Sequence, residues 1–142
     1  MLNQTPKLAI DDAHVALEAC RKKASEIGVA MNIAIVDESG SLMVFERMDG
    51  ALLGCIQIAI EKAYTSAVLG SPTADMGKLA QLGQPEYGLN TIAGGRVVII
   101  GGGVPIIHDK KIVGAVGCSS GTVDQDAAVA QTGVDALLKR LT

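Results

Sequence analysis

The sequence predicts an α+β (α/β) domain in which an antiparallel sheet of about five strands is covered by helices. Two observations predict this class. Apolar residues recur at helical spacing near both ends of the chain and in its middle. Between these stretches, short apolar runs follow one another across brief turns, which is the pattern of antiparallel strands. A length of 142 residues fits a single domain spanning 1–142.

The first predicted helix begins near Ile10 and ends before Gly28. Its apolar stripe alternates steps of three and four residues, through Ile10, Ala13, Leu17, Cys20, Ala24 and Ile27. Glycine is a common residue just beyond a helix end, which suits Gly28. Ala9 offers no side-chain oxygen at the start, so Asp11 or Asp12 is expected to serve as the cap.

A β-hairpin and a second helix are predicted next. Residues 31–48 alternate apolar and polar positions on both sides of the turn sequence DESGS, as paired strands do. Residues 52–69 are good helix formers with one apolar face, and Gly70 is expected to end that helix. Pro72 suits the first turn of a shorter helix, and residues 82–95 are expected to form a loop.

Three short strands and a final helix complete the predicted order. The strands are expected at 97–100, 105–108 and 112–118, with a tight turn between the last two. The helix is expected at 123–141, where Thr122 and Gln125 have the spacing of a capping box.

Three consecutive glycines, Gly101 to Gly103, raise the question of a phosphate-binding loop. Such a loop leads from a strand into a helix whose N–H groups point at the anion. Here the extended sequence VPII follows instead, and the GK[ST] ending is absent. We therefore interpret the glycines as a tight corner between strands.

Composition narrows the range of partners. The net charge is −3 and the basic residues are scattered, which argues against nucleic acid. No window reaches the roughly 18 consecutive apolar residues of a membrane span, and no signal-peptide pattern is visible. The three cysteines lack CxxC spacing and indicate thiols of a reducing compartment, so a cytoplasmic location is expected. The apolar composition favours a homo-oligomer.

Few side chains are candidates for chemistry. His14 flanks the stripe of the first helix and is either a ligand for a metal or haem iron, or an ordinary surface histidine. Cys55 lies near the start of the second helix, where the helix dipole favours a thiolate, or it is a buried structural thiol. No nucleophile–base pair is indicated by spacing, so catalysis is left open.

A polar cluster ends the second predicted strand, at Glu46, Arg47, Met48 and Asp49. Arg47 could bind a carboxylate through its guanidinium, or the cluster could form surface ion pairs only. Lys62, in the second helix, is open to the same two interpretations.

Six segments occur in a characteristic order over nearly the whole chain: FERMDGA, EKAYTS, QPEYGL, GGGVPI, VGAVGCSSGT and DQD. With them the chain resembles the GlcG/HbpS-like family, which includes the C-terminal domain of PduO-type proteins. The resemblance implies a profilin-like fold with a five-stranded antiparallel sheet, and homo-oligomers that are often octamers. It also implies haem binding, haem degradation or redox sensing, while other members belong to metabolic operons.

The resemblance makes the leading hypothesis an oligomeric cytoplasmic protein that binds haem or a related tetrapyrrole, as a sensor or carrier. His14 or Cys55 would ligate the iron, Arg47 or Lys62 would pair with a propionate, and no other metal is expected. Two alternatives stay open. One is a protein or enzyme that binds small hydroxy- or oxo-acids through the polar cluster, and the other is an assembly subunit without catalysis.

Overall fold

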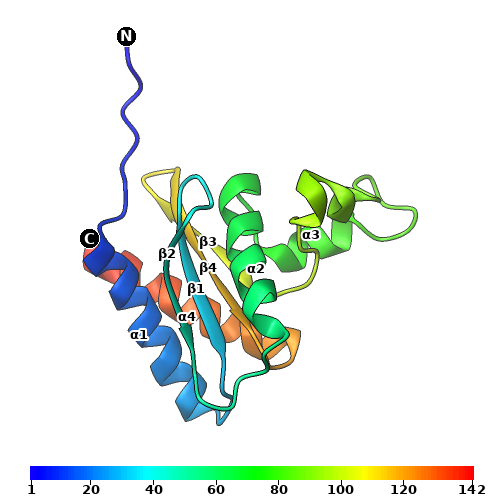
Figure 1. The fold of residues 1–142 in the computed structure, drawn as a ribbon. Helices are drawn as coiled ribbons and strands as arrows, with labels where there is room; N and C mark the ends of the chain where they lie inside the picture. The colour runs from blue at the N-terminus through cyan, green and yellow to red at the C-terminus, as the bar shows by residue number, and fades with distance from the viewer.

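Four antiparallel strands in the order β2-β1-β4-β3 form the centre of the computed structural model, which describes residues 1–142. Figure 1 shows α1 and α4 on one face of the sheet, and α2 with α3 on the other. The strands are β1 (Asn32–Asp37), β2 (Leu42–Arg47), β3 (Gly103–His108) and β4 (Lys111–Ser119). The helices are α1 (Ile10–Glu26), α2 (Cys55–Leu69), α3 (Thr73–Leu79) and α4 (Val123–Leu141). The predicted α+β class is confirmed.

Each face of the sheet has its own core. Successive side chains of β1 point to opposite faces, so Ile33 and Ile35 pack towards α1 and α4, whereas Ala34 packs towards α2. The core beneath α2 consists mostly of alanines, which lets the helix approach the sheet closely. Gly117 of β4 shows how closely, because a Cβ atom there would overlap the carbonyl oxygen of Ala59. None of the helices combines the length and the apolar character that crossing a membrane requires.

The helices α1 and α4, which share one face of the sheet, both have N-terminal caps, and an ion pair joins the start of α1 to the end of α4. The Asp12 carboxylate accepts a hydrogen bond from the Ala9 N–H at 3.1 Å, so of the two predicted caps Asp12 is the one used. Arg140, near the end of α4, donates to the other carboxylate oxygen of Asp12 at 3.0 Å. The capping box predicted for α4 is confirmed, since Thr122 and Gln125 accept from each other's backbone N–H at 3.0 and 3.2 Å.

The sheet has four strands and not about five, because residues 97–100 do not form the predicted strand. Their backbone is bonded to a helix instead of to a strand: the Val98 N–H donates to the Thr65 hydroxyl of α2 at 2.9 Å. The carbonyl oxygen of Ile99 lies against Gly77 of α3, where a Cβ atom would overlap it. The segment therefore links the helices on that face rather than extending the sheet.

The second helix begins at Cys55, three residues later than predicted. The backbone of Leu52 is held outside the helix by its neighbours. Its N–H donates to the Ser120 hydroxyl at 2.8 Å, and its carbonyl accepts from the Asn32 side chain at 2.9 Å. These bonds fix the approach to α2 against the ends of β1 and β4.

The turn between β1 and β2 is organised by Asp37. One of its carboxylate oxygens accepts from the Ser39 N–H at 2.9 Å, the Ser39 hydroxyl at 2.7 Å and the Ser41 N–H at 3.0 Å. Partial burial alone would raise the pKa of Asp37, but these hydrogen bonds stabilise the charged form and bring the pKa below its usual range. The DESGS turn is thus the hairpin connection that the sequence predicts.

The three glycines form a corner, as their sequence context predicts. Gly102 has a φ of +130°, and a Cβ atom there would lie 2.6 Å from both the Cys118 carbonyl oxygen and the Lys62 ammonium. Gly103 begins β3 directly, so no helix follows the glycines. The corner brings the main chain close to the middle of α2, at Lys62, and to the end of β4, at Cys118, which leaves no room for side chains.

Replacing Gly102 with alanine tests this interpretation of the corner. Gly102→Ala is expected to lower the free energy of unfolding by more than about 3 kcal/mol, because both the backbone conformation and the space oppose a Cβ atom. Gly28→Ala is the matched control, since Gly28 also has a positive φ of 72° but has nothing within 4 Å of the new atom. It is expected to cost only about 1 kcal/mol. Equal losses in urea unfolding would contradict the interpretation.

Candidate functional site

An exposed polar stripe runs along α1, beside its apolar stripe. His14, Glu18, Arg21 and Ser25 follow at steps of four, three and four, so they share one side of the helix. His14 is exposed and makes no hydrogen bond or ion pair within the chain. Arg21 lies seven residues further on, which is about 10 Å along the helix axis. The imidazole and the guanidinium thus lie on one continuous surface.

Arg21 connects this stripe to the end of β2. Its guanidinium lies 3.6 Å from the Glu18 carboxylate and 3.5 Å from the Glu46 carboxylate. Glu46 is opposite Ile33 in the sheet, so it points to the α1 side. The first helix and the edge strand are therefore joined by an ion-pair chain that remains partly exposed.

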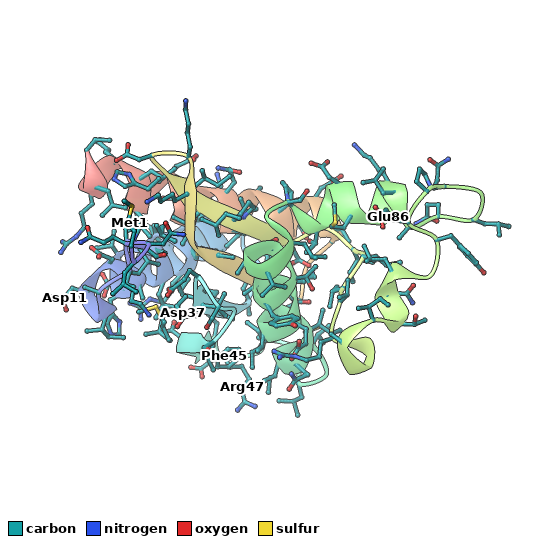
Figure 2. All side chains as sticks on the ribbon, turned by 90° about the horizontal axis from the view of Figure 1, so that it is seen from above. Met1, Asp11, Asp37, Phe45, Arg47 and Glu86 are labelled. Carbon is teal, nitrogen blue, oxygen red and sulfur yellow. The ribbon has the colours of Figure 1, made fainter.

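A groove of about 380 Å³ opens at this junction. It is lined by the predicted cluster Glu46, Arg47, Met48 and Asp49, together with Arg21 and Ser25 of α1. Met48 forms an inner wall, since its sulfur accepts from the Met31 N–H at 3.4 Å. Figure 2 shows Arg47 reaching outward from β2, beyond Phe45. The groove brings the Arg21 guanidinium and the Ser25 hydroxyl beside carboxylates, a set that can bind a small anion or a carboxylate group. Arg47 is opposite Asn32 in the sheet, so it contributes to the edge of the groove while its side chain points to the α2 side.

Cys55 is separated from these groups by the sheet. It is the first residue of α2 and half-buried, whereas His14 lies on α1 against the opposite face. One bound group therefore cannot be held by both residues of a single chain. The other two cysteines are buried: the Cys20 thiol donates to the Val129 carbonyl at 3.3 Å, and burial raises the pKa of the Cys118 thiol well above its usual range, with Cys20 adding to the effect.

Lys62 lies in the interior and not in the groove with Arg47. Its side chain is 1% exposed, and its ammonium donates to the Asp126 carboxylate at 2.9 Å and to the Cys118 carbonyl at 3.0 Å. The other oxygen of Asp126 accepts from the Gly121 N–H at 2.9 Å. All of the strong donors and acceptors at this point are paired, as a buried charge requires.

Sequence reasoning missed the residues that complete both features. Arg21 and Ser25 could have been found from the spacing of polar residues along α1, which continues the line begun by His14. Asp126 could have been found from Lys62 itself, because a lysine among the apolar positions of a helix needs a buried acid. A second cation, Arg96, stacks on the Tyr64 ring at 3.6 Å and pairs with Glu61 at 2.8 Å, which holds the end of the long loop against α2.

The remaining histidine and the acidic residues form no metal site. His108 is half-buried at the β3–β4 turn, where its ring lies 3.4 Å from the exposed Asp109 carboxylate. No group of three or more His, Cys, Asp or Glu side chains is close enough to hold an ion. Of the two histidines, His14 is thus the one without a partner in the chain.

Comparison with known proteins matches this chain along most of its length. The family model for "Haem degrading protein HbpS-like" matches residues 8–135. An uncharacterised 15.0 kDa protein from the dhaT-dhaS intergenic region of Citrobacter freundii is 37% identical over 132 residues, covering 93% of either chain. The crystal structure of Klebsiella pneumoniae protein ORFY superposes with a TM-score of 0.92 at 35% identity, over 96% of this chain and 97% of that one.

A further solved structure contains a ligand. The complex of PduOC with haem superposes with a TM-score of 0.88 at 34% identity, over 92% of this chain and 95% of that one. These similarities agree with the predicted resemblance to the GlcG/HbpS-like family, and the matched structures share the fold of this chain.

The buried ion pair can be tested by removing one or both charges. Lys62→Met is expected to lower the free energy of unfolding by about 3–5 kcal/mol, because it leaves the Asp126 carboxylate buried without a counter-ion. The double variant Lys62→Met/Asp126→Leu is expected to recover a large part of that loss. Urea unfolding measures both. If Lys62→Met unfolds with a free energy within about 1 kcal/mol of the wild-type value, the buried Asp126 carboxylate does not need Lys62 as its counter-ion.

Proposed function

The chain belongs to the HbpS-like haem-degrading protein family, and on this premise we propose that it binds haem or a related tetrapyrrole, as a self-associating cytoplasmic sensor or carrier. The observation that carries the proposal is the exposed surface of α1, where the uncommitted His14 imidazole is followed by Arg21 and the Arg47 groove. Imidazole nitrogen is a common haem-iron ligand, and guanidinium groups pair with carboxylates such as propionates. Bound haem would supply a redox-active iron.

His14 is the proposed iron ligand in preference to Cys55. The imidazole is exposed and has no partner in the chain, whereas the thiol is half-buried on the far face of the sheet, away from Arg21 and Glu46. Lys62 is not proposed for a propionate, because its charge is already matched by Asp126. Arg47 and Arg21 take that role in this proposal.

Self-association is part of the proposal for a physical reason. None of the five surface hollows of the single chain includes His14, so a haem lying on α1 would keep one face in water. Several large apolar side chains are also exposed, among them Leu52, Leu53 and Leu82. A second copy of the chain would cover these apolar side chains and also the exposed face of the haem.

Titration of the purified apo-protein with hemin tests the proposal. A Soret shift is expected for the wild type, and His14→Ala is expected to weaken binding by about tenfold or more, since an iron–ligand bond is lost. Cys55→Ala is the matched control and is expected to bind as the wild type does. An absent shift, or an unchanged titration in His14→Ala, would count against the proposal. Loss in Cys55→Ala alone would assign the ligand to the thiol.

A second candidate function is binding of a small hydroxy- or oxo-acid in the groove, as a binding protein or enzyme. The Arg21 guanidinium beside the Ser25 hydroxyl, with Arg47 at the edge of the groove, favours it, because such a set suits a carboxylate with a neighbouring oxygen. A third candidate function is that of an assembly subunit without catalysis, and it assigns no role to the residues of the groove.

The acid-binding candidate predicts a ligand-dependent melting temperature. Small hydroxy- and oxo-acids are expected to raise the Tm of the wild type, because a ligand that binds only the folded state stabilises it. Arg47→Ala is expected to abolish the rise, whereas Arg96→Ala, which removes an arginine outside the groove, is expected to keep it. A Tm that does not respond to any of these acids would rule the candidate out.

A further inference from the structure

A second groove lies on the other side of the molecule, between α3 and the start of α4. It has a volume of about 350 Å³, and the extended segment that contains Ile99 and Gly101 forms its floor. A Cβ atom on Gly101 would contact the Cβ atoms of Ala74 and Val123 at 3.4 and 3.5 Å, so the two walls meet closely at the base. The groove is thus narrow at its base, where glycine and alanine residues let its walls approach.

Exposed apolar side chains belong to this groove or to residues next to its lining residues in sequence. Leu79, Leu82, Ile100 and Val123 are 38%, 83%, 45% and 47% exposed. Val123, the first residue of α4, lines the groove, and Leu79 and Leu82 directly follow the lining residues Lys78 and Gln81. Exposed apolar surface thus lies in the groove and next to it in sequence. Burying such surface is favourable, and a contiguous apolar area around a groove is typical of a protein contact.

The charges at the rim indicate which partner fits. Lys78 lines the groove from α3 and Asp124 lines it from α4. Both are exposed, and neither forms an ion pair within the chain. A surface with one cation and one anion on opposite walls of an apolar centre is complementary to itself, because a two-fold axis through the centre places each charge against its opposite.

We propose that this groove is the docking surface for a second copy of the chain, with Lys78 of each copy facing Asp124 of the other. The inference rests on the self-association in the proposed function and names the face that mediates it, independently of haem. The apolar side chains around the groove would form the centre of the contact, and the two charge pairs would set its orientation.

Charge reversal at the rim tests the proposal on the full chain. Sedimentation velocity over a concentration series gives the Kd for self-association of the wild type, Lys78→Glu, Asp124→Lys and the double reversal. Each single reversal places like charges opposite each other twice, and is expected to raise the Kd by about tenfold or more. The double reversal Lys78→Glu/Asp124→Lys restores opposite charges and is expected to return the Kd towards the wild-type value.

A control on the same helix separates this effect from a general change of charge. Asp135 is exposed on α4, where it accepts from the Gln131 side chain, and it does not line the groove. Asp135→Lys is expected to self-associate as the wild type does, and circular dichroism checks that every variant is folded. A monomeric wild type would overturn both this inference and the proposed self-association. An oligomer that is unchanged by the single reversals, or not restored by the double one, would overturn only the assignment of this face.

Discussion

The buried ion pair between Lys62 and Asp126 is the constraint on which the rest of the structure depends. Lys62 belongs to α2 and Asp126 to the first turn of α4, two helices that cover opposite faces of the sheet. Their side chains meet at the end of β4, where the Cys118 carbonyl supplies a further acceptor. The pair therefore connects the two helical layers around the end of the sheet, and the glycine corner is the space that this connection requires.

The surface with functional groups is rigid because of a similar close contact on the other face. Gly133 of α4 packs against the Cys20 sulfur and the backbone of Ala16, so the absence of a side chain on Gly133 lets α1 and α4 approach each other closely. The ion pair between Arg140 and Asp12 joins the same helices at their ends. His14 and Arg21 are thus presented on a helix whose position is fixed by packing, which is the arrangement that a binding site needs.

Local patterns predicted the parts of the fold that depend on neighbours in sequence. The apolar stripes of α1 and α4, the DESGS turn and the Thr122 cap all involve residues a few positions apart. The strand predicted at 97–100 is wrong, because the sequence of an extended apolar run does not show what its N–H groups bond to. Here the Val98 N–H donates to Thr65 of a helix and not to a neighbouring strand. The polar cluster at 46–49 could be recognised in the sequence. Arg21 could not be assigned to it, because the two meet only through the tertiary contact between α1 and β2.

The order of the strands also has a consequence for how the chain folds. β1–β2 and β3–β4 are hairpins with short connections, whereas β1 pairs with β4 across about 80 residues of chain. Closing that long loop carries the larger entropic cost, so we expect the hairpins to form before it. Lys62 finds its carbonyl and its carboxylate only in the last quarter of the sequence, so the first half emerges from the ribosome with this charge still in water.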